Sequence, residues 1–103
     1  MLLIELNEFN RDLLQRLSAR HGFRNIERIL GWNRADTWTS DAYDTGFLEP
    51  WVQWVSVHTG VPSSQHQVKN LGDVPKLAED QIWERWSRRG LTSVVWGVMN
   101  GIR

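Results

Sequence analysis

The apolar positions of this chain fall in short runs separated by polar stretches and glycines, and the runs predict both strands and helices. Leu2–Leu6 is a short apolar run typical of a buried strand. Residues 11–21 place Leu13, Leu14 and Leu17 on one face of a helix. A strand followed so closely by a helix is typical of the opening of an α/β unit.

Single residues mark the ends of the next segments. Asn10 can cap the first helix by accepting hydrogen bonds from first-turn amides. Gly22 follows that helix and suits a left-handed C-cap. A second short helix is predicted over residues 25–30. Residues 34–43, centred on Trp38, suit a strand or an extended segment.

The middle of the chain contains an apolar run without Gly or Pro. Residues 51–58 predict a buried helix, although their valines are β-branched. Pro50 suits its first turn, where the missing N–H costs nothing. Residues 61–75 form the longest irregular stretch, and loops of this length often serve function.

The last third predicts a helix and then a strand. Residues 78–89 place Ile82, Trp83 and Trp86 on one helix face, and Glu84 lies four residues before Arg88, a spacing that favours an ion pair. Residues 91–98 are apolar and predict a second buried strand. The predicted fold class is therefore α/β, a partial three-layer sandwich with a mostly parallel sheet.

The domain organisation has two interpretations. A parallel sheet needs several strands with helices on both faces, and this sequence predicts two strands, or three with the segment near Trp38. Residues 1–103 are either a small complete α/β domain or a single α/β domain that forms the N-terminal part of a larger enzyme. We favour the second interpretation.

The amino-acid composition argues against several classes of function. Lys plus Arg and Asp plus Glu both number 12, so the formal charge is zero and nothing points to nucleic acid or an anionic membrane surface. The absence of cysteine excludes disulfides, thiolate zinc sites and cysteine nucleophiles. No apolar run approaches the ~20 residues of a membrane helix. These features predict a cytoplasmic protein.

Tryptophan is unusually frequent, with seven residues at positions 32, 38, 51, 54, 83, 86 and 96. Each Trp side chain buries a large area, and a small core cannot cover all of them. We therefore expect some of them to face a ligand, a partner or a further part of the same protein, and self-association through exposed Trp is one such outcome.

The segment 49–68, EPWVQWVSVHTGVPSSQHQV, points to a chemistry. Its features are a Pro-started helix, a Thr-Gly end, and a loop that contains Pro62 and His66. In this order they resemble the nucleophile-bearing segment of the alkaline phosphatase superfamily, which includes sulfatase-like and type I phosphodiesterase/nucleotide pyrophosphatase-like members. The resemblance covers roughly residues 1–70, and it implies metal-dependent hydrolysis of a small-molecule phosphate or sulfate ester.

The same resemblance implies a metal site after the first predicted strand. Asn7 and Glu8 stand where family members have acidic metal ligands. They would hold a divalent cation (Zn, Mn, Mg or Ca), with Asn7 offering a neutral amide oxygen in place of a carboxylate. The remaining ligands of the family come from much later in the sequence.

The hydroxyl nucleophile of the family has no counterpart here. Counting back ten residues from Gly60 reaches Pro50, next to Glu49. The nearest upstream hydroxyl is Thr45, and Ser56 lies within the predicted helix. Glu49 is therefore the catalytic candidate, as a carboxylate nucleophile or metal ligand, with ordinary first-turn helix chemistry as the alternative. The chain alone is expected to be inactive.

The roles of several other polar residues each allow two interpretations. His58 could cap helix carbonyls, and His66 could serve packing or hydrogen bonding rather than ligation. Asp41 and Asp44 could pair around a cation or belong to a solvated loop. At the level of the whole chain, the alternative to a hydrolase is a non-catalytic α/β binding or structural domain that uses exposed Trp at an interface. An ordinary small α/β domain with a coincidental resemblance is the third possibility.

Overall fold

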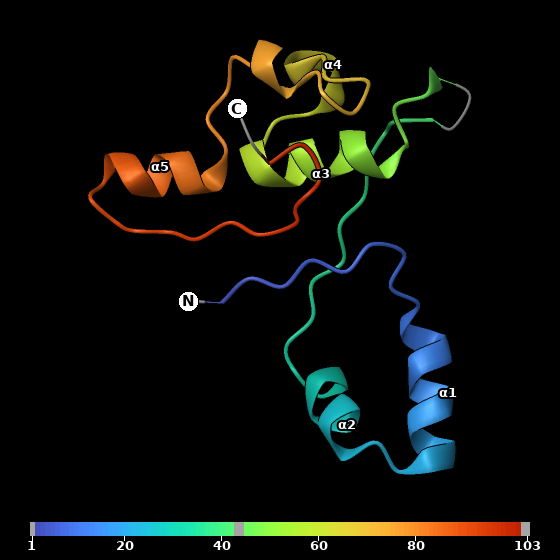
Figure 1. The fold of residues 1–103 in the computed structure, drawn as a ribbon. Helices are drawn as coiled ribbons and strands as arrows, with labels where there is room; N and C mark the ends of the chain where they lie inside the picture. Colours follow the sequence, from blue (N-terminus) through green and yellow to red (C-terminus); the bar gives the residue numbers. More distant parts are fainter. Residues whose placement is uncertain (1, 43–44, 102–103) are drawn as a thin grey trace. The chain divides into compact units, whose positions relative to one another are not determined.

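A computed structural model describes residues 2–42 and 45–101, and it is built from short helices (Figure 1). The chain divides into two compact units, Met1–Thr39 and Ser40–Arg103. The first unit contains α1 (Arg11–His21) and α2 (Arg24–Leu30), and the second contains α3 (Pro50–Thr59), α4 (Ser63–His66), the 3₁₀-helix η2 (Val74–Lys76) and α5 (Ile82–Arg88).

The predicted α/β fold class is wrong, because the described residues contain helices and no strand. Leu2–Leu6 forms no strand, and Leu2 is 82% exposed. Residues 91–98 also form no strand ladder, and Trp96 is 91% exposed. An apolar run becomes a strand only when a neighbouring strand accepts its backbone hydrogen bonds. Neither run finds such a neighbour within its own unit.

Local signals determine α1. The Asn10 side chain accepts a hydrogen bond from the N–H of Leu13 at 2.9 Å, which confirms the predicted cap. Gly22 ends the helix in the left-handed conformation, with φ 69°, and donates its N–H to the Ser18 carbonyl. The predicted bounds of 11–21 are those observed.

The helical hairpin of the first unit has little buried apolar surface. The Arg11 guanidinium donates to the Leu30 carbonyl at 2.9 Å and so links α1 to the end of α2. Ser18 is the buried residue of α1, while Leu13 and Leu17 remain 47% and 37% exposed. Two short helices leave part of each apolar stripe in water when no third element covers them.

The second unit has a small apolar core around α3. Pro50 occupies the first turn, as predicted, and Gly60 ends the helix with φ 75°. The buried apolar side chains are Val52, Val55, Val68, Val74 and Leu77. They come from α3, from the loop after α4, and from η2 and the residue that follows it, so the stretch predicted to be irregular (61–75) supplies two of the five, Val68 and Val74.

The last helix is shorter than predicted. It begins at Ile82 rather than Ala78, because the Glu84 carboxylate accepts from the N–H of Gln81 at 2.8 Å and closes the first turn there. Arg88, near the end of the helix, donates to the Asp80 carboxylate at 2.8 Å. After α5 the chain returns to α3, where the side chain of Asn100 donates to the Trp51 carbonyl (Figure 1).

Candidate functional site

The two predicted metal ligands lie in an exposed turn of the first unit. Asn7 and Glu8 are both exposed, and Glu8 has a left-handed φ of 55°. Glu8 and Asp12 line a shallow hollow together with the cations Arg11 and Arg34. This hollow holds charges of both signs, and the guanidinium groups oppose the binding of a metal cation.

The described residues do not assemble a metal centre. In 2–42 and 45–101 there is no group of three or more His, Cys, Asp or Glu side chains that could hold a metal ion. The amide oxygen of Asn7 and the carboxylate of Glu8 are suitable in kind for a hard cation, which takes six or more oxygen ligands. These two side chains supply fewer oxygen ligands than such a cation takes, so further ligands are needed to complete its coordination.

Glu49 lies at the N-terminus of α3, in the second unit. It is half-buried and extended, with φ −74° and ψ 144°, and its carbonyl accepts from the N–H groups of Val52 and Gln53 at 2.9 and 3.0 Å. Its side chain does not cap the helix. Glu49 belongs to the second unit and the pair Asn7–Glu8 to the first.

A serine and a histidine meet inside the second unit. The Oγ of Ser56 on α3 lies 3.0 Å from Nε2 of His66, at the end of α4. His66 is 5% exposed, and its Nδ1 accepts from the N–H of Val68 at 3.1 Å. A nucleophile and its base show this kind of contact, so the position of the ring proton decides what the pair can do.

The hydrogen bonds assign the proton to Nε2. Because the N–H of Val68 points at Nδ1, that nitrogen carries the lone pair, and the neutral ring donates from Nε2 to Ser56. Burial lowers the pKa of His66, against the opposing effect of the Glu79 and Asp41 carboxylates, and favours this neutral form. His66 therefore does not withdraw a proton from Ser56, and the pair serves hydrogen bonding, one of its two predicted roles.

Other predicted polar residues are also engaged in structure. The carboxylate of Asp41 accepts from Ser63 at 2.6 Å and from the side chain of Gln53 at 2.7 Å, which joins α3 to α4. Asp44, its predicted partner around a cation, lies outside the described residues. The Thr45 hydroxyl donates to the Ala42 carbonyl at 2.6 Å within a turn.

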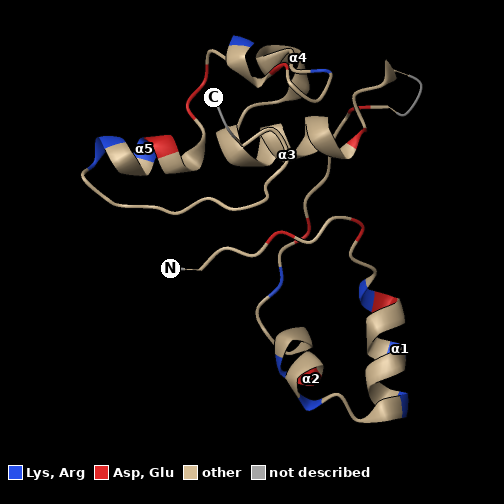
Figure 2. Cartoon of the chain, in the orientation of Figure 1, with Lys and Arg blue, Asp and Glu red and all other residues tan. Residues whose placement is uncertain are grey.

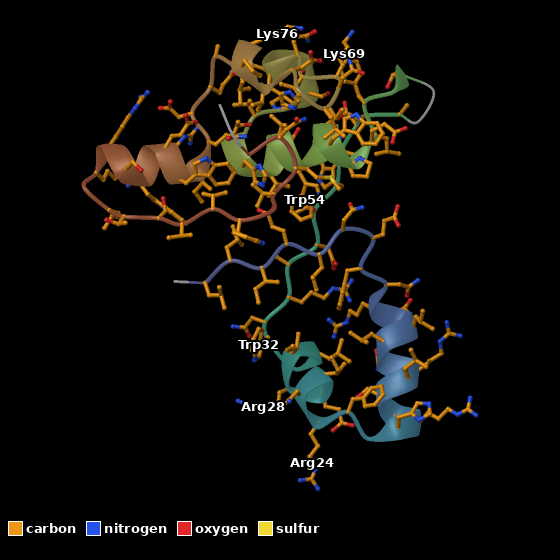
Figure 3. The ribbon with its side chains drawn as sticks, in the orientation of Figure 1. Arg24, Arg28, Trp32, Trp54, Lys69 and Lys76 are labelled. Atoms are coloured by element: carbon orange, nitrogen blue, oxygen red, sulfur yellow. The ribbon has the colours of Figure 1, made fainter. Side chains whose placement is uncertain are left out.

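His58 packs among aromatic rings. It is 2% exposed and stacks on Trp54, with ring centroids 6.0 Å apart, and it makes an edge contact with Trp83, with ring centroids 4.7 Å apart. Trp54 lies on α3 (Figure 3) and Trp83 on α5. Arg85 of α5 donates to the Thr59 carbonyl at the end of α3, at 2.7 Å.

One buried polar residue is not indicated by the sequence pattern. Asn100 is 9% exposed, and its amide nitrogen donates to the Trp51 carbonyl at 2.9 Å. Its sequence context, Asn before Gly, is typical of a turn. A turn signal carries no information about contacts with residues far away in the chain, which is why this role was missed.

The surface combines exposed Trp with long uncharged stretches. Trp32, Trp38 and Trp96 are 67%, 89% and 91% exposed, while the other Trp residues are half-buried. No Lys, Arg, Asp or Glu lies on α3 or in residues 90–101 (Figure 2). Across the described part of the chain, every helix is too short or too polar to cross a membrane.

No protein-family model matches the chain, and neither a curated protein nor a solved structure matches it. The resemblance to the alkaline phosphatase superfamily thus depends on the residues that carry it.

Proposed function

We propose that the chain supplies part of a metal-dependent phosphate or sulfate ester hydrolase similar to the alkaline phosphatase superfamily. The folded segment 50–66 is the observation that carries the proposal. Pro50 starts the helix, Gly60 ends it, and His66 returns to contact Ser56 at 3.0 Å. The features that produce the resemblance thus belong to one packed and hydrogen-bonded piece of the molecule.

The proposal gives the predicted residues limited roles. Glu49 and the N–H of Trp51 border the reacting group at the N-terminus of α3, where the helix dipole favours an anion. Asn7 and Glu8 contribute some of the oxygen ligands of a divalent cation, and further ligands come from sequence outside this chain. Ser56 is occupied by His66, so no hydroxyl nucleophile is assigned, and the chain alone does not turn over substrate.

A cytoplasmic location belongs to the same proposal. It is supported by the absence of cysteine, which suits a reducing compartment.

Metal titration tests this proposal. The chain is titrated separately with Zn²⁺, Mn²⁺, Mg²⁺ and Ca²⁺ while Trp fluorescence is followed, and bis(p-nitrophenyl) phosphate is then added. We expect a saturable response that Glu8→Ala weakens about tenfold, and ester binding that requires the metal. Glu27→Ala removes the same charge from exposed α2 and serves as the matched control. A lack of response to all four metals, or equal behaviour of the two variants, contradicts the proposal.

A non-catalytic interaction domain is the second candidate, favoured by the exposed tryptophans. Trp96 is 91% exposed within the uncharged stretch 90–101, so two copies can bring these stretches together without charge repulsion. The proposed occupant is a second copy of this chain. Light scattering over a range of concentrations should show a dimer that Trp96→Ala weakens and Trp32→Ala does not. A monomer at every concentration contradicts this candidate.

A further inference from the structure

Near the end of the second unit, the side chain of Asn100 makes several hydrogen bonds to distant parts of the unit. This residue has a left-handed φ of 51° and is 9% exposed. Its amide nitrogen donates to the carbonyls of Trp51 at 2.9 Å and Asn70 at 3.3 Å, and its amide oxygen accepts from the N–H of Gly72 at 3.2 Å. One side chain thus links the first turn of α3 to the loop before η2.

A second contact holds the backbone of the same residue. The side chain of Gln81, which is 0% exposed, donates to the Asn100 carbonyl at 2.6 Å. The start of α5 is thereby tied to the same point as α3. We call this set of hydrogen bonds, made by Asn100 with Trp51, Asn70, Gly72 and Gln81, the Asn100 clamp.

The clamp requires an amide at position 100. Both carbonyls that face the amide nitrogen of Asn100 need a donor, and an aspartate of nearly the same shape has only acceptors when ionised. Conversion of Asn100 to aspartate would place carboxylate oxygen against the carbonyls of Trp51 and Asn70. A buried contact between acceptors without a donor is destabilising.

The residue after Asn100 makes that conversion chemically accessible. Asn100–Gly101 is the one Asn–Gly pair of the sequence. Glycine has no Cβ to hinder approach of its backbone nitrogen to the preceding amide carbon. Packing keeps glycine there, because a Cβ at position 101 would collide with the side chain of Val98. The fold thus places its most deamidation-prone pair at the clamp.

We propose that Asn100 is a deamidation site, protected by the clamp while the second unit is closed, and that its modification opens the clamp. The backbone nitrogen of Gly101 bonds to Cγ of Asn100 and loses its proton, the bond from Cγ to Nδ2 breaks, and ammonia leaves with that proton. Water then opens the succinimide ring to give aspartate or isoaspartate. No oxidant or reductant is required, and the proposal is independent of the function proposed above.

The protection follows from geometry. In the closed unit the amide nitrogen of Asn100 is held by the carbonyls of Trp51 and Asn70, so the side chain cannot rotate toward the backbone nitrogen of Gly101. The reaction requires local opening, and its rate in the folded protein is reduced by the fraction of open molecules.

Peptide mass spectrometry tests the proposal on the intact chain, incubated at mildly alkaline pH with and without guanidinium chloride. Asn100 should deamidate faster than every other Asn in guanidinium, and about tenfold or more slower in the folded protein. The deamidated fraction, separated by ion exchange, should melt at a lower temperature than its parent. Equal rates in the two conditions, or an unchanged melting temperature, would overturn the proposal.

A pair of variants checks the clamp without the covalent step. Asn100→Asp should lower the melting temperature or prevent folding, while Asn33→Asp, which makes the same change at an exposed loop position, should leave the melting temperature unchanged. Equal melting temperatures for the two variants would overturn the role of the Asn100 amide.

Discussion

The two units contain helices of similar length but hold them by different means. α1 has 11 residues and α3 has 10. The first depends on its own end caps and on one hydrogen bond from Arg11 to α2. The second is surrounded by buried valines and by side chains that reach its carbonyls from residues as distant as Arg85 and Asn100. Helix formation needs only local signals, whereas resistance to opening needs long-range contacts.

The largest expected difference between the two units comes from a Leu→Ala substitution made in each of them. Leu77 is 4% exposed and Leu17 is 37% exposed. We expect Leu77→Ala to lower the free energy of unfolding by about 3 kcal/mol, because it leaves a cavity in the core. Leu17→Ala should cost less than about 1 kcal/mol, since that side chain is already partly in water. Urea unfolding measures both, and equal losses would contradict the comparison.

The long-range cap of α3 should have the next largest effect. Arg85→Ala removes the guanidinium that donates to the Thr59 carbonyl at 2.7 Å. We expect a loss of about 1.5 kcal/mol, the scale of a hydrogen bond to a charged donor. Arg89→Ala, a change at an exposed position just after α5, is the matched control. If thermal melting shows the same loss of stability for Arg85→Ala and Arg89→Ala, the hydrogen bond from Arg85 to Thr59 does not stabilise α3.

The local cap of α1 should matter less to the whole molecule. Asn10→Ala removes the acceptor of the Leu13 N–H and should cost about 1 kcal/mol of helix stability. The loss should appear as faster amide exchange in α1 and leave exchange in α3 unchanged. Faster exchange in both helices would show that the two units are coupled.

The smallest predicted effect is a pH dependence that belongs to the second unit. Burial lowers the pKa of His66 below 6.5, so the unfolded chain takes up this proton at higher pH than the folded chain. The stability that results is complete above pH 6.5 and declines as the pH falls below 6.5 toward the lowered pKa. Denaturation from pH 7.5 to about 5 should show this decline, and His66→Gln should reduce it while His21→Gln should not.

The sequence predicted the elements that depend on neighbours in the chain. The bounds of α1 followed from Asn10 and Gly22, and those of α3 from Pro50 and Gly60. Both strand predictions were wrong, because apolarity shows that a segment avoids water and does not show that a partner strand exists. Leu2–Leu6 is such a segment.

The candidate site was predictable to a similar degree. Sequence order placed Glu49 at the N-terminus of α3, but it predicted a loop at His66, which ends the short helix α4. It could not show that His66 would donate to Ser56, since the ring tautomer depends on the N–H of Val68. Nor could it show that Asp41 would bond with α3 and α4, which is a property of the packed unit.

Amide hydrogen exchange of the native chain, read by mass spectrometry, tests the central claim most directly. The claim is that an α3-centred unit is stably packed while the two apolar runs predicted to be strands form no strand. We predict slow exchange for amides 53–60 and exchange near the unprotected rate for most amides of residues 2–6 and 92–98. Strong protection of both apolar runs would reveal backbone hydrogen bonds of a sheet and contradict the account.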